Sequence, residues 1–131
     1  MRIYIDTSAA LKVLTTEEHT SACTDFFNTT WEGGDILLAS TWLEAEMRSI
    51  ARRYLTNITP SAITSFLSLC TRVADTDDAL ATLVRANWTL RSGDGLHLAL
   101  ALTHNADAIL TYDKELVTVA HSHGLQTISP A

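Results

Sequence analysis

The chain has 131 residues, of which 47% are apolar and 18% are charged, a balance that excludes a disordered protein. Its 15 acidic residues against 9 basic ones give a formal net charge of −6. This charge argues against a protein that holds nucleic acid by bulk positive charge. It does not exclude one whose acidic side chains bind divalent cations, because bound cations reverse the local field.

The length fits one domain over residues 1–131 with a single sizeable core. No apolar run reaches the roughly 20 residues of a membrane span, and the N-terminus shows no signal-peptide pattern. Cys23 and Cys70 form no CxxC motif, so we expect buried free thiols. Together these features predict a cytoplasmic protein.

The first predicted element is a short strand over Ile3-Tyr4-Ile5, buried on both faces and ended by Asp6. Thr7 and Ser8 are expected to cap a helix over about 9–14. An ionised carboxylate at the end of a buried strand is costly without a positive partner. In an open parallel sheet this end is also where ligands bind. Asp6 is therefore the first candidate site residue.

A helix over about 18–30 is followed by a second buried strand over 36–40 and a helix from Ser40 or Thr41 to about Leu55. The apolar stripe of this third helix is predicted to be Leu43, Met47, Ile50 and Tyr54. Glu44 and Glu46 flank this stripe on opposite sides. Glu44 has Arg48 one helical turn on, whereas Glu46 has no such partner. Periodicity thus favours Glu46 as a site residue without excluding Glu44.

Two consecutive helices, Pro60–Thr71 and Asp77–Leu90, are predicted before the next strand, and Thr59 is the expected cap of the first. Their expected inward residues are Ile63, Phe66, Leu67 and Cys70 in the first helix, and Leu80, Leu83, Val84 and Trp88 in the second. We interpret the acids Asp75, Asp77 and Asp78 as capping charges in preference to metal ligands.

Ser92–Gly95 interrupts the pattern, and a deeply buried helix over Leu96–Leu102 follows, with Asp94 in its first turn. A third strand over 108–111 is closed by Asp113, before a helix over 114–121 and a short strand over 125–128. This alternation predicts a three-layer α/β/α fold with a central parallel sheet and a helical insertion between the second and third strands.

Four carboxylates are expected to meet at one edge of this sheet. They are Asp6, Glu46, Asp94 and Asp113. Crowded carboxylates raise one another's pKa unless cations neutralise them, and oxygen-only ligand sets suit Mg²⁺ or Mn²⁺. The pattern therefore indicates metal-dependent phosphate or phosphodiester chemistry. The alternative, that these acids are scattered helix caps, stays open at this point.

Other polar residues allow two interpretations each. Arg48, Arg52 and Arg53 form either a solvated helix face or a patch that contacts phosphates. We expect His97 to be a buried histidine with satisfied hydrogen bonds, although a role in the site is conceivable because it lies one turn after Asp94. Trp42, Tyr54 and Trp88 fit a helix core at least as well as a base-stacking role.

Four motifs, in this order, resemble those of the PIN-domain family. They are Ile-Tyr-Ile-Asp6-Thr-Ser-Ala-Ala-Leu, Ser40 with Glu46 and Arg48 beyond it, Asp94-Gly-Leu-His97-Leu-Ala-Leu-Ala, and Leu-Thr111-Tyr-Asp113-Lys-Glu-Leu116. A chain of this length that carries all four resembles the VapC toxins of bacterial and archaeal toxin–antitoxin pairs.

The resemblance implies a Mg²⁺- or Mn²⁺-dependent endoribonuclease that hydrolyses RNA phosphodiester bonds and is usually a homodimer. It also implies silencing by a small VapB-like antitoxin whose C-terminal segment enters the active-site groove. By motif position, the catalytic and metal-binding set is Asp6, Glu46, Asp94 and Asp113. Thr7 and Thr111 lie beside these acids and would orient a carboxylate or a water. The number of cations, one or two, stays open.

Two alternatives differ in class. A catalytically silent PIN-like binding module would share the fold but cut no RNA. A phosphoacceptor receiver domain would carry paired acids after the first strand, whereas Thr7 follows Asp6 here, and a Lys after the last strand, which is missing.

Overall fold

The computed structural model describes residues 1–54, 57–74 and 76–131. Within these residues a five-stranded sheet has the order β3-β2-β1-β4-β5, and all neighbouring strands are parallel. The strands are β1 (Arg2–Ile5), β2 (Ile36–Ser40), β3 (Thr71–Val73), β4 (Ala108–Leu110) and β5 (Gln126–Ile128). The predicted α/β fold with a central parallel sheet is thus confirmed.

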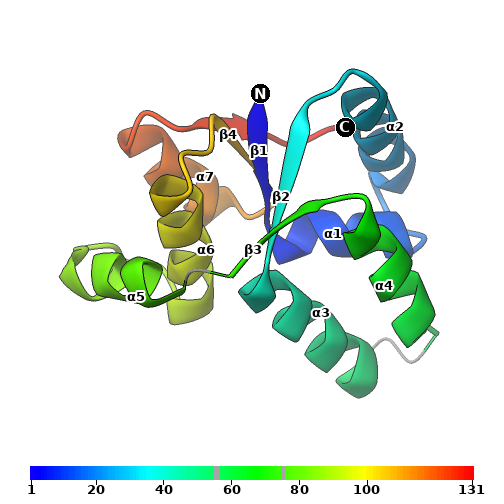
Figure 1. The fold of residues 1–131 in the computed structure, drawn as a ribbon, viewed down its shortest axis with the longest axis horizontal. Helices are drawn as coiled ribbons and strands as arrows, with labels where there is room; N and C mark the ends of the chain where they lie inside the picture. The colour runs from blue at the N-terminus through cyan, green and yellow to red at the C-terminus, as the bar shows by residue number, and fades with distance from the viewer. Residues whose placement is uncertain (55–56, 75) are drawn as a thin grey trace.

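Helices cover both faces of the sheet (Figure 1). One face carries α1 (Thr7–Leu14), α2 (Thr20–Glu32), α3 (Thr41–Arg53) and α4 (Pro60–Ser68). The other carries α5 (Thr76–Arg85), α6 (Ser92–Thr103) and α7 (Lys114–Ser122). In the described part of the chain, no helix is both long and apolar enough to cross a membrane.

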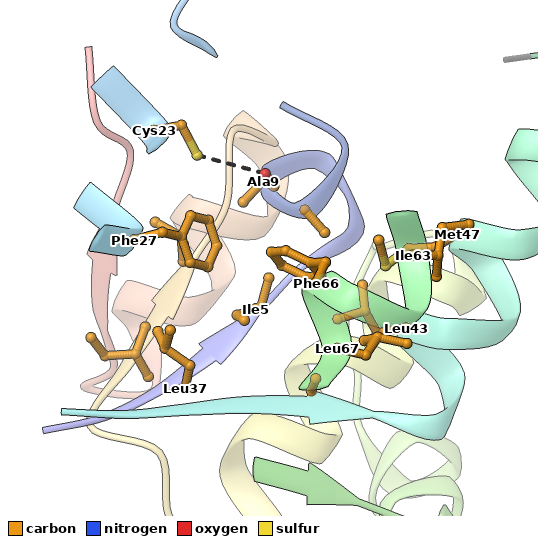
Figure 2. Packing of buried hydrophobic residues seen from close by; sticks show 14 of the residues in the cluster. Ile5, Ala9, Cys23, Phe27, Leu37, Leu43, Met47, Ile63, Phe66 and Leu67 are labelled. Atoms are coloured by element: carbon orange, nitrogen blue, oxygen red, sulfur yellow. Dashed lines mark hydrogen bonds between the residues drawn. The ribbon is translucent and has the colours of Figure 1, made fainter. Parts of the chain in front are cut away.

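The central strand β1 connects the two cores because its side chains alternate between the faces. Ile3 and Ile5 pack with α1 to α4, whereas Tyr4 packs with α5 to α7. In the first core, the rings of Phe27 and Phe66 meet edge to face with their centroids 5.4 Å apart (Figure 2). β1 is therefore buried on both faces, as its sequence predicts.

Helix caps fix where the chain turns away from the sheet. Ser40 accepts a hydrogen bond from the Leu43 N–H at the start of α3, and Thr59 caps α4 ahead of Pro60, as predicted. The cap of α1 differs from the prediction, because the side chain of Asp6, not of Thr7 or Ser8, accepts the Ser8 N–H. The expected cap Asp75 and the expected helix end at Leu55 lie outside the described residues.

The segment between β2 and β4 contains the two expected helices and also a short strand that the sequence pattern did not predict. The helix α4 ends at Ser68, and Thr71–Val73 then pairs with β2 at the sheet edge. Only Val73 of this three-residue strand is buried. A strand this short, with one buried residue, leaves no alternating pattern for sequence analysis to detect.

Three predicted inward residues are exposed instead. Leu80 and Val84 lie on the solvent side of α5, whose buried contacts come from Ala79 and Leu83. Tyr54 is the C-cap of α3, with a backbone φ of −130°, so its ring leaves the apolar stripe of that helix. These predictions were wrong because periodicity does not show how much of a helix its neighbours cover or where the helix ends.

The burial of Leu67 and the exposure of Val84 can be tested together by mutation. Leu67→Ala, at a position 3% exposed, should lower the free energy of unfolding by about 2–5 kcal/mol. Val84→Ala, at a position 83% exposed, should change it by less than about 0.5 kcal/mol. Urea denaturation followed by circular dichroism measures both, and equal losses would contradict this packing.

Candidate metal and active site

The four predicted carboxylates line one pocket of about 430 Å³. Asp6 follows β1, Asp113 caps α7 after β4, Glu46 lies on α3 after β2, and Asp94 lies in the first turn of α6. β1 pairs with β2 on one side and with β4 on the other, so consecutive connections diverge here. Such switch points at the carboxyl ends of parallel strands are where open α/β sheets bind ligands.

Asp6 is 3% exposed and is held by hydroxyl groups. Its Oδ2 accepts hydrogen bonds from the Ser8 hydroxyl at 2.7 Å and from the Thr111 hydroxyl at 2.8 Å. Its Oδ1 lies 3.6 Å from Nε2 of His97. One oxygen of this buried carboxylate is thus anchored by neutral donors, and the other faces the remaining polar groups of the site.

Glu46 is anchored in a similar way. Its Oε1 accepts hydrogen bonds from the Thr7 hydroxyl at 2.6 Å and from Nε2 of His97 at 2.5 Å. Burial opposes ionisation of Glu46, but the hydrogen bond from His97, the electrostatic interaction with the His97 ring and the Thr7 hydroxyl lower its pKa overall. Glu46 is consequently held as a carboxylate with a fixed orientation.

Asp94 and Asp113 face a common cation, Arg91. The guanidinium Nε of Arg91 lies 3.2 Å from Oδ2 of Asp94, and its Nη2 lies 3.8 Å from Oδ2 of Asp113. Oδ1 of Asp113 accepts the N–H groups of Glu115 and Leu116 in the first turn of α7. Burial and the nearby Asp113 raise the pKa of Asp94, with Arg91 opposing them. Arg91 therefore offsets only part of the negative charge that gathers around Asp94 and Asp113.

Glu44 lies outside this pocket, as its helical position suggested. It forms ion pairs with Arg72 and with Arg48, and these two arginines lower its pKa. Arg48 also donates to the hydroxyl of Thr64. The Glu44–Arg48 pair is thus the surface ion pair expected from the spacing of one helical turn.

His97 is fully buried and hydrogen-bonded, which confirms the expected satisfied histidine. The sequence did not indicate that its partners would include Glu46 and Thr7. Arg91 was also missed, although its position three residues before Asp94 is a spacing that brings side chains together on a helix.

The chemistry of the donors fits Mg²⁺ or Mn²⁺, which prefer carboxylate and water oxygens. Within residues 1–54, 57–74 and 76–131, however, no three His, Cys, Asp or Glu side chains are already close enough to hold a metal ion. The carboxylates surround the pocket, and Arg91 stands between two of them. The fold provides a shared acidic pocket, not a closed coordination shell.

The fold and the pocket define a small α/β protein with four acids at the carboxyl edge of a parallel sheet. The family model of the PIN domain matches residues 3–122. The chain therefore belongs to the PIN-domain family. No curated protein matches the chain in a sequence search.

Solved structures of toxin–antitoxin proteins share this fold. VapBC2 from Rickettsia felis, solved bound to a promoter DNA fragment, matches with a TM-score of 0.76 at 13% identity over 100% of both chains. FitAcB from Neisseria gonorrhoeae matches with a TM-score of 0.69 at 15% identity over 96% of both chains.

VapC20 from Mycobacterium tuberculosis, a toxin that cleaves the sarcin–ricin loop, matches with a TM-score of 0.64 at 15% identity. This match covers 89% of the present chain and 94% of VapC20. At these identities the three structures establish the fold alone. The sheet order also differs from the 2-1-3-4-5 order of receiver domains, which removes that alternative.

The raised pKa of Asp94 predicts a pH-dependent effect on stability. A carboxyl group whose pKa is higher in the folded state destabilises the fold once pH exceeds that value. Without divalent cations, Asp94→Asn should therefore be more stable than the wild type at neutral pH. The gain should shrink as pH falls through the folded pKa and vanish below the ordinary value of 3.8.

Urea denaturation in EDTA at several pH values measures this difference. Asp25→Asn, at an exposed position of α2, is the matched control and should stay within about 0.5 kcal/mol of the wild type. A wild type more stable than Asp94→Asn at neutral pH would contradict the assigned environment of Asp94.

Proposed function

We propose that the protein is a Mg²⁺- or Mn²⁺-dependent endoribonuclease and the toxin component of a VapBC-type toxin–antitoxin module. The observation that carries this proposal is the pocket itself, in which carboxylates from four separate elements come together. Membership in the PIN-domain family and the likeness to VapC and FitB folds support it. Residues 1–131 would act as one PIN-like domain.

Asp6, Glu46, Asp94 and Asp113 would hold the cation or cations. When bound, the cation supplies positive charge against the scissile phosphate and activates a water for in-line attack on phosphorus. Asp6 or Asp94 would orient this water, while Thr111 and Thr7 fix the carboxylates of Asp6 and Glu46 by the hydrogen bonds described above. Asp113 would either bind a cation directly or place its negative charge next to the residues that do.

We assign no covalent nucleophile among the described residues that line the pocket. Ser8 lines the pocket, but its hydroxyl donates to Asp6 and accepts the N–H of Tyr112. Because Asp6 is assigned to the cation, Ser8 would orient this carboxylate and would not attack phosphorus. Hydrolysis by water predicts products with a 5′-phosphate. A 2′,3′-cyclic phosphate would indicate attack by the RNA 2′-hydroxyl instead.

A positively charged surface beside the acids would bind the RNA backbone. A second pocket is lined by Lys12, His19, Tyr112 and Lys114, among others. Lys12 directly follows Leu11, and Lys114 directly follows Asp113, both of which line the acidic pocket. Residues adjacent in sequence therefore line the two pockets, and a strand with its scissile phosphate at the acids would place neighbouring phosphates near these lysines.

The contacts of Arg91 support the proposal that an antitoxin binds in the acidic pocket. Its contacts with Asp94 and Asp113 indicate that the acidic pocket accepts a guanidinium group. A small VapB-like partner with an Arg-bearing C-terminal segment would use the same carboxylates and exclude the cation. We also propose a homodimer and, given the free thiols Cys23 and Cys70, a reducing cytoplasm. A neighbouring gene encoding such a partner would be the first sign of this module.

The nuclease activity can be tested with purified protein and total RNA. We expect cleavage in Mg²⁺ or Mn²⁺, loss of cleavage in EDTA, and a decrease of at least about 100-fold in Asp6→Asn, because removing an anionic ligand weakens cation binding. Asp25→Asn, which makes the same chemical change at an exposed site, should cut as the wild type does.

Three outcomes would contradict this proposal. Products that end in a 2′,3′-cyclic phosphate would overturn attack by water. Cleavage that survives both EDTA and Asp6→Asn would overturn the metal-dependent mechanism. Binding of RNA without cleavage under all conditions would favour the catalytically silent PIN-like module instead.

A further inference from the structure

A buried chain of hydrogen bonds lies behind Glu46. It begins at the Leu43 N–H, which donates to the hydroxyl oxygen of Ser40 at 3.0 Å. The Ser40 hydroxyl lies 2.7 Å from the Tyr4 hydroxyl, which lies 2.7 Å from Nδ1 of His97. Nε2 of His97 then contacts Oε1 of Glu46 at 2.5 Å.

The three side chains between Leu43 and Glu46 are sealed from solvent. Ser40, Tyr4 and His97 are all 0% exposed, and they come from three different elements, β2, β1 and α6. A phenylalanine would fill the space of Tyr4 between Ile3 and Ile5 without a polar group to satisfy. The hydroxyl of Tyr4 therefore needs an explanation beyond packing.

The protons of this chain can be assigned from its ends. A carboxylate only accepts hydrogen bonds, so Nε2 of His97 must donate to Glu46. A neutral imidazole has a single N–H, so Nδ1 is then an acceptor, and the Tyr4 hydroxyl must donate to it. Ser40 in turn donates to the oxygen of Tyr4 and accepts from Leu43. Nε2 of His97 also lies 3.0 Å from the hydroxyl oxygen of Thr7, which itself donates to Glu46. Burial raises the pKa of Tyr4, so its hydroxyl stays a donor.

This assignment fixes the two oxygens of Glu46 for different tasks. Oε1 receives the donors of both His97 and Thr7. Oε2 lies on the side of Gly93, where an added methyl group would sit 3.3 Å from it. The absence of a side chain at Gly93 leaves this second oxygen room at the pocket.

We propose that Tyr4 and His97 are positioning residues that hold Oε1 of Glu46 and thereby present Oε2 to a divalent cation. The Tyr4 hydroxyl selects the Nε2–H tautomer of His97, and this tautomer anchors the carboxylate. The inference rests on the proposed metal site. Neither Tyr4 nor His97 contacts the cation or the RNA in this scheme, so both act through Glu46.

Tyr4→Phe tests this role because it removes a single hydroxyl group. Without it, Nδ1 of His97 loses its donor and both tautomers become accessible. We expect the Kd for Mn²⁺, measured by calorimetry or electron paramagnetic resonance without RNA, to rise about tenfold. Nitrogen NMR of histidine-labelled protein at mildly alkaline pH should show the Nε2–H tautomer in the wild type and a mixture in Tyr4→Phe.

Two comparisons separate positioning from a loss of folding. Tyr54→Phe makes the same chemical change at an exposed tyrosine and should leave the Kd for Mn²⁺ unchanged. His97→Gln keeps an N–H donor for Glu46, so it should retain more Mn²⁺ affinity than His97→Leu. A purely structural histidine would give no such rescue at the level of metal binding.

The outcomes distinguish this inference from the proposed function. Wild-type protein that binds no Mn²⁺ would overturn the metal site and the positioning role together. Mn²⁺ binding that is equally tight in the wild type and Tyr4→Phe would overturn the positioning role alone. If Tyr4→Phe does not fold, the wild-type spectrum still decides, because an Nδ1–H tautomer of His97 would contradict the proton assignment.

Discussion

The structure depends on one constraint, which is that a buried acidic side chain closes the central strand, whose last three residues are buried. Asp6 follows Ile5 directly and is itself almost inaccessible to water. The cost of burying it is offset by hydroxyl donors from Ser8, in the first turn of α1, and from Thr111, which directly follows the neighbouring strand β4. The pairing of β1 with β4 is thus both a sheet contact and the means by which the site is formed.

Much of the sheet follows from local pattern, because short continuous apolar runs such as Ile3-Tyr4-Ile5 and 36–40 are typical of strands buried on both faces. The edge strand Thr71–Val73 could not be predicted from the sequence, because it depends on pairing with β2 and not on its own residues. The exposure of Val84 was missed for the same reason, because helix periodicity identifies a face but not what covers it. Local sequence determined the central elements, and tertiary contacts determined the edges.

In the candidate site, too, some residues are predictable from the sequence and others only from the fold. Its acids were identifiable because they occupy positions where strands end and helices begin, and topology brings those positions together. Of the groups that fix the acids, Thr7 and Thr111 were indicated only by the family resemblance. The roles of His97 and Tyr4 were not indicated, because they depend on partners 36 to 93 residues away. One signal was present in the sequence, because a tyrosine within a doubly buried strand must find a partner for its hydroxyl. The identity of that partner, however, is a property of the fold.

The same distinction bears on how a chain with a net charge of −6 would act on RNA. Around Asp6 and Glu46 the fold uses hydroxyl and imidazole groups, which orient carboxylates but leave most of their negative charge in place. The full positive charge beside Asp94 and Asp113 belongs to Arg91, whose side chain is 83% exposed, and such ion pairs are weak in water. Arg91 can therefore be displaced at low cost by a cation or by another guanidinium group. Under the proposed function, the pocket repels RNA until cations occupy it, so cation binding would control substrate binding as well as chemistry.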